Sequence, residues 1–312
     1  MKIRPFEHKD TNSLIELLEI VYRKSFTIDW WNWKYNQNPM GESVILVAEN
    51  NGKIVGLRSF WKYDLMYRSN LLKAYQPVDT VVHEKYRGQG LFTKLTTAAI
   101  NEAKHYDADL LFNYPNQNSL PGYLKLGWNL LDHVRWWIKP IGIVGFLSVP
   151  LAKGQRDSLK IPGERKFVSC SDGSARNNTN SNFISAIRTP AFLEWRYGLN
   201  PETDYCYLKS DGLETLVRVT QKGKCRELLV MHTDFGDNWF EECLEFAKSN
   251  DICYIANPAI TRSLAEKKMK SKGFFRLKNT INFVVLPLKD SVKEIVTNPF
   301  NWDFSLELLD TF

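Results

Sequence analysis

The sequence predicts an α+β fold of mixed α/β layers, in which a mostly antiparallel sheet is flanked by helices. Short runs with alternating apolar residues in the first half indicate strands, and Asn51-Gly52 between two of them indicates a hairpin turn. Apolar residues recur at helical spacing across residues 89–106. The predicted order up to residue 138 is strand, helix, antiparallel meander, helix, strand, helix, strand.

The first elements follow from local patterns. Alternation around Ile3 predicts an opening strand, and residues 10–12 (Asp-Thr-Asn) supply cap residues for an apolar-periodic helix. The hairpin joins residues 44–48 to residues 54–60, and a further strand pair is predicted within residues 63–82. These strands form the meander.

The remaining elements of the first half follow the helix at 89–106, which places Leu91, Leu95 and Ala99 on one side. We expect a buried strand, a short helix and a closing strand. Their ranges are 110–114, 119–125 and 129–138.

A chain of 312 residues is long enough for two domains. We place the first at 1–140, a linker rich in Pro and Gly at 141–165, and the second at 166–312. The apolar run 141–152 would span roughly 18 Å as a helix, against a bilayer core of about 30 Å, so no transmembrane segment is expected. We interpret it as a connector packed between domains, with contact at a membrane surface as the alternative.

Part of the first half recurs in the second. Residues 33–39 (Trp-Lys-Tyr-Asn-Gln-Asn-Pro) match residues 195–201 (Trp-Arg-Tyr-Gly-Leu-Asn-Pro), and Gly127-Trp128 corresponds to Gly273-Phe274. Two copies of one fold are predicted. The copies differ at one turn. Residues 87–90 of the first copy are Arg-Gly-Gln-Gly, whereas the corresponding residues 233–238 contain one glycine and two acids, so the second copy is degenerate.

Composition narrows the classes of ligand and compartment. A net charge of +6, from 41 basic and 35 acidic residues, favours anionic small molecules and does not call for nucleic acid. The cysteines (Cys170, Cys206, Cys225, Cys243 and Cys253) are odd in number and nowhere spaced as CxxC, and the five histidines are scattered. We therefore expect no disulfide framework, no metal site and a cytoplasmic protein. The N-terminus carries early charges and no long apolar run, so no signal peptide is expected. The sequence leaves the oligomeric state open.

The turn that precedes the helix at 89–106 has the composition of an anion site. Gly88 and Gly90 permit positive φ and close approach of a ligand, while Arg87 and Lys85 add positive charge. A helix N-terminus supplies backbone N–H donors and a favourable dipole for a pyrophosphate. The alternative is a plain strand-to-helix turn.

This turn resembles the acetyl-CoA signature of the GNAT superfamily, a basic-x-x-Gly-x-Gly loop after a strand. Lys85 stands where the family more often has Gln or Arg. A second signature of the family follows at the expected distance, formed by Asn116, Ser119, Tyr123 and Gly127-Trp128. The resemblance covers about residues 1–140, and tandem GNAT-like modules with a degenerate second copy are suspected.

The resemblance implies a cofactor site for acetyl-CoA as co-substrate. The amides of the turn would hold the pyrophosphate, and the backbone of the preceding strand would pair with the pantetheine arm, one amide facing the thioester oxygen. Asn116 and Ser119 would lie along the same arm. The residues of the turn and strand are Thr80, Val81, Val82, Arg87, Gly88, Gln89, Gly90 and Leu91.

Two residues are expected to carry proton transfer. Tyr123 would protonate the departing CoA thiolate, because a phenol pKa near 10 is close to a thiol pKa near 8.5. The alternative is a ring packed under the cofactor. Asp79, on the cofactor strand, ranks first as general base, with capping or pairing at a strand end as its alternative. His83 and Glu84 fall in the loop, where solvated side chains are the alternative, and a base acting through water or an amine that arrives neutral are further options.

Aromatic residues are expected to be mainly structural. Trp30, Trp31, Trp33 and Tyr35 have helical spacing and recur in part in the second copy, which favours the core over an acceptor site. Trp136-Trp137 are candidates to line an inter-domain cleft.

The leading hypothesis is an N-acetyltransferase that acts on a small-molecule amine, with an acceptor pocket shaped by the second module. A similarity to tandem proteins associated with surface polysaccharide synthesis suggests an amino sugar. A Fem-type aminoacyl transferase, which takes its acyl group from tRNA, and a non-catalytic acyl-CoA sensor or scaffold are the alternatives.

Overall fold

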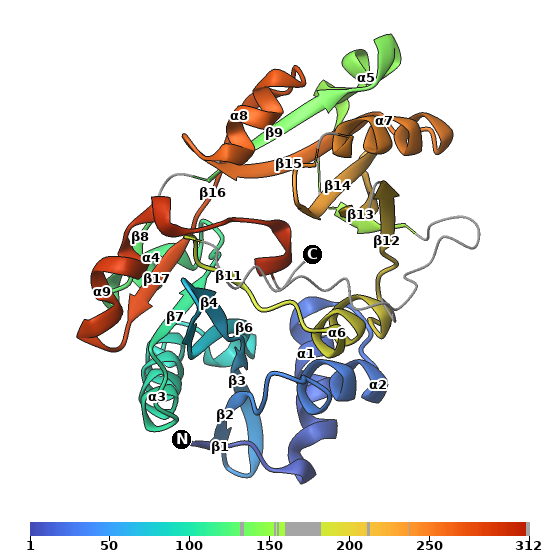
Figure 1. Cartoon of the computed structure of the whole chain (residues 1–312). Coiled ribbons are helices and arrows are strands. Elements are labelled where there is room, and N and C mark those ends of the chain that lie inside the picture. The colour runs from blue at the N-terminus through green and yellow to red at the C-terminus, as the bar shows by residue number, and fades with distance from the viewer. Residues whose placement is uncertain are drawn as a thin grey trace. The chain divides into compact units, whose positions relative to one another are not determined.

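The computed structural model describes residues 1–131, 134–152, 154, 156–159, 182–210, 213–236 and 238–309 (Figure 1). They form two compact units that do not follow the chain linearly. The first unit contains Met1–Leu131, the described part of 179–187, and Asn282–Asn301. The second contains the described part of 132–178, Arg188–Ile281 and the chain from Trp302. Cys170 lies outside the described residues.

The first unit is built on a seven-stranded sheet in which only one pair of neighbours, β6 and β7, is parallel. The predicted Asn51-Gly52 turn joins β2 to β3, and both residues have positive φ, which suits Asn and Gly. In spatial order the strands are β1 (Lys2–Pro5), β2 (Val44–Asn50), β3 (Lys53–Lys62), β6 (Ala74–Val82), β7 (Leu110–Asn113), β17 (Val284–Pro287) and β8 (Asn129–Leu130). A small separate sheet holds β4 (Leu65–Tyr67), β5 (Asn70–Leu72) and β11 (Ser185–Ala186).

The helices of the first unit bury one face each. The predicted helix at 89–106 is confirmed as α3 (Leu91–His105), whose side chains Leu95 and Ala99 enter the core of the main sheet. The short helix near 119–125 is α4 (Leu120–Lys125). The other helices are α1 (Thr11–Tyr22), α2 (Ile28–Trp31) and α9 (Asp290–Thr297).

The second unit repeats the succession of strand pairs found in the first. From β12 to β16 the neighbours are antiparallel, antiparallel, parallel, antiparallel and antiparallel, as they are from β2 to β8. In spatial order the strands are β12 (Cys206–Ser210), β13 (Leu213–Lys222), β14 (Cys225–Thr233), β15 (Tyr254–Ile260), β9 (Val134–Pro140) and β16 (Phe275–Ile281), and β10 (Arg156–Ser158) also pairs with β13. Its helices are α5 (Gly142–Ser148), α6 (Pro190–Leu193), α7 (Trp239–Ser249) and α8 (Leu264–Ser271).

The strand predicted at 129–138 is therefore wrong as one closing strand of the first sheet. Only β8 lies in that sheet, whereas β9 pairs with β15 and β16 of the second unit. The equivalent place beside β7 is taken by β17, from the far end of the chain. β9, which the sequence places in the first domain, thus belongs to the sheet of the second unit, and β17, which the sequence places in the second domain, belongs to the sheet of the first. Trp136 and Trp137, on β9, are buried within the second unit.

A local feature also recurs. In both units a threonine, Thr27 or Thr189, caps a four-residue helix by accepting a hydrogen bond from the backbone amide three residues on. Each short helix continues into a π-helical turn, at Asn32–Asn36 and at Glu194–Gly198. The aromatic residues of the first turn, Trp33 and Tyr35, are buried, which agrees with the structural role expected for them.

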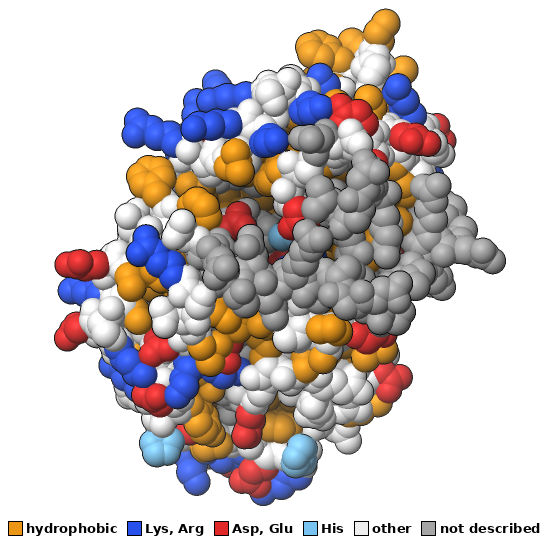
Figure 2. Space-filling model, viewed as in Figure 1, with side chains coloured by type: hydrophobic (Ala, Val, Ile, Leu, Met, Phe, Trp, Pro, Cys, Tyr) orange, Lys and Arg blue, Asp and Glu red, His pale blue; other side chains and the backbone are white. Residues whose placement is uncertain are grey.

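The run 141–152 is not the packed connector that the sequence suggested. It forms α5 and a 3-10 turn, and most of its bulky side chains are exposed (Figure 2). Of the helices that the structure describes, none is long and apolar enough to cross a membrane.

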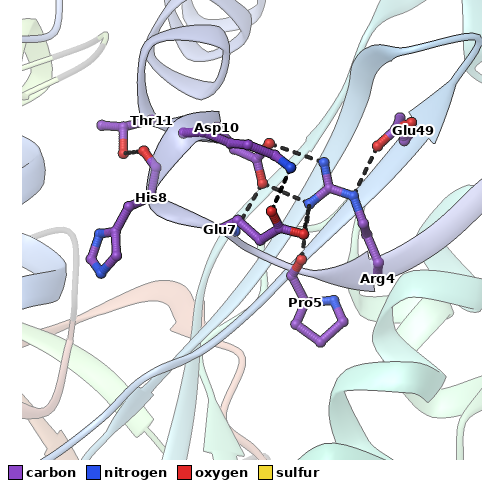
Figure 3. A network of polar contacts seen from close by, with 8 residues as sticks. Arg4, Pro5, Glu7, His8, Asp10, Thr11 and Glu49 are labelled. Atoms are coloured by element: carbon purple, nitrogen blue, oxygen red, sulfur yellow. Dashed lines mark hydrogen bonds and ion pairs between the residues drawn. The ribbon is translucent and has the colours of Figure 1, made fainter.

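The start of α1 is held by an ion-pair network instead of the simple side-chain cap that was predicted (Figure 3). Both Asp10 oxygens accept hydrogen bonds from Arg4, at 2.7 and 2.9 Å, and the amide of Glu7 donates to the same carboxylate at 2.8 Å. Arg4 Nε also donates to Glu49 at 2.8 Å, which joins β1 to the end of β2. The hydrogen bond from Arg4 holds the pKa of Asp10 below its ordinary value.

Candidate active site

The centre of the first sheet opens where β6 and β7 diverge. The two strands pair only at Ala74–Leu110 and Tyr75–Leu111, although β6 continues to Val82. A register shift between β3 and β6, between the pairs Arg58–Thr80 and Phe60–Pro77, accompanies the divergence. From Thr80 onward, the described part of the chain places no strand beside β6 on its β7 side, although the carbonyl of Val82 accepts a hydrogen bond from Arg87 Nε. Thr80, Val81 and Val82 lie in this part of the strand.

The turn between β6 and α3 has the backbone geometry of an anion site. Gly88 and Gly90 have φ of 76° and 73°, values that side-chain-bearing residues rarely adopt. A Cβ at either position would meet no atom within 4 Å, so the backbone conformation is what requires glycine here. The first turn of α3 follows Gly90, and its amides have no carbonyl partner within the helix. With the positive end of the helix dipole, they form a donor set for phosphate oxygens.

Arg87 is held by hydrogen bonds to the backbone of its own loop. Its amide donates to the carbonyl of Glu84 at 3.2 Å, and its side-chain Nε donates to the carbonyl of Val82 at 3.2 Å. His83 Nδ1 accepts a hydrogen bond from the amide of Lys85 at 3.3 Å, which fixes the 3-10 turn Glu84–Tyr86. The backbone donors that remain for an anion therefore start at Gly88.

Tyr123 lies on α4 with its phenol oxygen held by two donors. Arg58 Nη2 and Asn113 Nδ2 each donate to this oxygen at 2.6 Å, and the tyrosine is only 2% exposed. Because the oxygen accepts both bonds, its own proton is left to be donated to another group. The ring packs edge-on against Phe92 of α3 and against Trp128, with centroids 5.7 and 4.9 Å away.

Arg58 and Asn113 are the two residues of this cluster that sequence reasoning missed. Arg58 is fully buried on β3, and its guanidinium lies over the rings of Phe60, Phe92 and Tyr123. An arginine near the middle of a largely apolar strand was the available signal, because a buried cation needs a specific environment. Asn113 is the last residue of β7, and no pattern distinguishes it from an ordinary strand end.

Asp79 lies on β6 in a buried ion pair. Lys34 Nζ is 2.8 Å from its carboxylate, and the hydroxyl of Tyr35 donates a hydrogen bond to the same oxygen. The Lys34 ammonium also lies over the rings of Trp30 and Trp61, at 4.8 and 5.3 Å. Burial and the neighbouring charge of Asp79 raise the pKa of Tyr35 well above its ordinary value. These contacts place Asp79 in a buried ion pair within β6, and its part in proton transfer stays a prediction.

Asn116 and Ser119 shape the entry to α4. Asn116 Oδ1 accepts hydrogen bonds from the amides of Asn118 and Ser119, each at 3.0 Å, as in an Asx turn. The carbonyl of Asn116 accepts from the amide of Leu120 at 3.0 Å. Asn116 thereby sets the direction from which α4 presents Tyr123.

The end of β7 is supported by the segment that contains β17. The side chain of Asn282 donates to the carbonyl of Pro115 at 3.0 Å, and Val284 pairs with Asn113. Within the part of the chain that the structure describes, no group of three His, Cys, Asp or Glu side chains is arranged to hold a metal ion.

Comparison with known proteins gives one sequence match and several structural ones. Residues 2–131 match the model of the acetyltransferase (GNAT) domain family, and no curated protein sequence matches the chain. The fold is similar to GCN5-related N-acetyltransferases from Anabaena variabilis ATCC 29413 (TM-score 0.63, 13% identity, 92% of this chain and 73% of that one) and Kribbella flavida (0.62, 11%, 95% and 73%). It is also similar to a conserved protein of unknown function from Enterococcus faecalis V583, named a probable N-acyltransferase (0.63, 11%, 92% and 72%).

The structural likenesses show the fold. The family match covers residues 2–131, a range that includes β6, β7 and the turn before α3. The chain therefore contains, at residues 2–131, an acetyltransferase domain of the GNAT family.

Proposed function

We propose that the first unit transfers an acetyl group from acetyl-CoA directly to a small-molecule amine. The observation that carries the proposal is that three parts occur in one unit: the end of β6 beyond its pairing with β7, the positive-φ glycine turn, and a tyrosine whose phenol oxygen accepts two hydrogen bonds. An amine acceptor is the class that this family implies. An amino sugar is our narrower proposal, which the similarity of the 195–201 motif to polysaccharide-associated proteins supports only by analogy.

The co-substrate would lie along β6 and across the start of α3. The amides of Gly88, Gln89, Gly90 and Leu91 would bind the pyrophosphate, with the Arg87 guanidinium close by. The backbone of Thr80, Val81 and Val82 would pair with the amides of the pantetheine arm, as a strand pairs with an open sheet edge. Asn116 and Ser119 would border the arm where it passes α4.

The chemistry needs little beyond this binding. The amine nitrogen attacks the thioester carbon, and a backbone N–H of β6 stabilises the oxyanion of the tetrahedral intermediate. The carbon–sulfur bond then breaks, and the thiolate takes the proton of Tyr123. Positioning two reactants in attack geometry supplies up to about 7–11 kcal/mol of the barrier reduction.

The proton that the amine loses has a less defined destination. Asp79 was the first candidate for the base, but its carboxylate is buried against Lys34 and Tyr35. We propose that Asp79 anchors the register shift of β6. An amine that arrives neutral loses one proton as the amide forms, and this proton leaves through water. His83, whose Nδ1 is engaged by the amide of Lys85, is a weaker candidate.

We also propose that the second half of the chain is a degenerate copy of the first. The matching succession of strand pairs and the two capped π-helical turns support a duplication. In sequence the copies would still be 1–140 and 166–312, joined by 141–165, although each contributes one strand to the other sheet. Because the equivalent turn at 233–238 lacks the paired glycines, we infer one cofactor site per chain.

An amine panel tests the proposed activity. The full-length protein is mixed with acetyl-CoA and one amine at a time, including amino sugars, and the thiol released is measured. We expect thiol release that depends on both enzyme and amine. Tight acetyl-CoA binding without turnover on any amine would favour an acyl-CoA sensor, and acyl transfer from charged tRNA would favour the Fem-type alternative.

A further inference from the structure

The segment formed by α5 and the 3-10 turn Val149–Leu151 presents an unusual amount of apolar surface. On α5 itself, Ile143 is 81% exposed, Val144 74%, Phe146 66% and Leu147 67%. Leu151 of the turn is 58% exposed. Figure 2 shows these hydrophobic side chains together at the top of the view, over α5. A contiguous apolar patch on a folded protein marks a surface that meets something else.

The attachment of α5 to the second unit explains why its bulky residues point outward. Gly145 is the residue through which α5 packs against the segment at Cys253. It is buried, and a Cβ at this position would be 2.1 Å from the Cys253 carbonyl oxygen. The amide of Ile141 donates to the same carbonyl at 2.9 Å, and the thiol of Cys225 donates to the carbonyl of Ser148 at 3.0 Å. A surface helix ordinarily buries its large apolar face. Here the glycine face is buried and the large apolar face is outside.

Positive charge surrounds the apolar segment. Residues 140–152 carry no charged side chain, while Lys139 and Lys153 bracket the segment in sequence. In space, Lys222 lines a cavity together with Val149 and Ala152. Lys224 is exposed in the same β13–β14 turn, beside Cys225, which contacts Ser148. The acids near these contacts are Asp157, Asp251 and Glu227. Glu227 lines the same cavity but is paired there with Arg156, so the cations still outnumber the acids.

We propose that α5 and the Val149–Leu151 turn dock on the surface of an anionic phospholipid bilayer. Phe146, Leu147 and their apolar neighbours would enter the boundary between headgroups and acyl chains, and the lysines would face lipid phosphates. A segment of about 12 residues spans roughly 18 Å as a helix, which suits lying in the interface and is too short to cross.

The charges favour a bilayer over a second copy of this chain. A two-fold contact through α5 would use the same patch on both copies and would bring two sets of lysines together. Like charges in such a contact oppose association. An anionic bilayer supplies the apolar interior and the opposite charge at once.

Sedimentation with vesicles tests the proposal on the full-length protein. We expect binding to phosphatidylglycerol-containing vesicles, weaker binding to pure phosphatidylcholine vesicles, and loss of binding at high salt. The double variant Val144→Asp/Phe146→Asp should bind the anionic vesicles at least about tenfold more weakly, since charge on the inserted face opposes entry. Lys222→Gln/Lys224→Gln should reduce binding to anionic vesicles and leave the weak binding to neutral ones unchanged.

The matched control is Ile20→Asp/Leu71→Asp, which alters two side chains that are each 50% exposed on the first unit. It should bind vesicles like the wild type. Unchanged acetyl-CoA binding and thermal unfolding in all variants would show that the effect is local. The proposal is overturned if the wild type ignores anionic vesicles, if the control loses binding as strongly as the α5 variant, or if the α5 variant instead splits a wild-type dimer that does not bind vesicles.

Discussion

Replacement of Tyr123 by Phe removes one oxygen atom and keeps the packed ring. That oxygen accepts hydrogen bonds from Arg58 and Asn113 at 2.6 Å each, in a site where all three side chains are buried. A hydrogen bond from a charged donor contributes about 1.5–3 kcal/mol and one from a neutral amide about 0.5–1.5 kcal/mol. We therefore expect Tyr123→Phe to lower the free energy of unfolding by about 3 kcal/mol.

The same substitution should also slow the reaction. If Tyr123 protonates the CoA thiolate, its loss should reduce kcat by about 10²–10⁴-fold. The affinity for acetyl-CoA should change little, because the phosphate turn and the β6 edge are untouched. Thiol release gives kcat, calorimetric titration gives the Kd for acetyl-CoA, and denaturant unfolding gives the stability.

A second variant separates catalysis from packing. Asn113→Ala removes one of the two donors to the phenol and leaves the tyrosine proton in place, so it should lower stability with a much smaller effect on kcat. If Tyr123→Phe retained a wild-type kcat while losing stability, Tyr123 would be a structural residue and the assignment of the acid would be refuted.

Three further predictions concern buried contacts. Asp79→Asn should lower the free energy of unfolding by about 3 kcal/mol, because it leaves Lys34 as an uncompensated buried cation, and kcat of the folded variant should stay within about tenfold; a loss above a hundredfold would identify Asp79 as the base. Since Arg4 lowers the pKa of Asp10 in the folded state, this pair stabilises at neutral pH and the stability should fall below about pH 4; Asp10→Asn should flatten that acid limb in urea titrations. Gly145→Ala should expose α5 to proteolysis, because its Cβ would overlap the Cys253 carbonyl; unchanged cleavage would contradict this account of how α5 is attached.

The local elements of the first unit could be predicted from the sequence because their signals are local. Asn51-Gly52 has the φ values of its turn type, and the pattern in 89–106 produced α3 to within two residues at its start. The glycine turn was likewise visible, since positive φ at Gly88 and Gly90 needs glycine wherever the turn lies in the fold.

The exchange of β9 and β17 could not be predicted in the same way. Apolar residues along Val134–Pro140 show that the segment is a buried strand, but strand patterning does not identify the neighbouring strand. Both exchanged strands occupy equivalent places next to β7 and β15, so either arrangement satisfies the local pattern. The two arrangements differ only in which strands, far apart in the sequence, pair with each other.

The polar contacts of the candidate site were also beyond the sequence. Asp79 was an acid on the right strand, but its neutralisation by Lys34 depends on how α2 and the following π-helical turn pack against β6. Arg58 is 65 residues from Tyr123 in sequence. The outward face of α5 was missed because an apolar run predicts burial, and the buried contact of Gly145 reverses that expectation.

The central claim, that the turn before α3 binds the pyrophosphate of acetyl-CoA, is tested most directly by calorimetric titration of acetyl-CoA into the wild type, Gly88→Glu and Gly52→Glu. Both glycines have φ of 76° and open space around a Cβ, so the two substitutions impose similar backbone strain, but only Gly88 lies in the turn. We predict that the wild type and Gly52→Glu bind one acetyl-CoA per chain with similar affinity, while Gly88→Glu binds at least about a hundredfold more weakly. Undiminished binding by Gly88→Glu, or an equal loss in Gly52→Glu, would contradict the account.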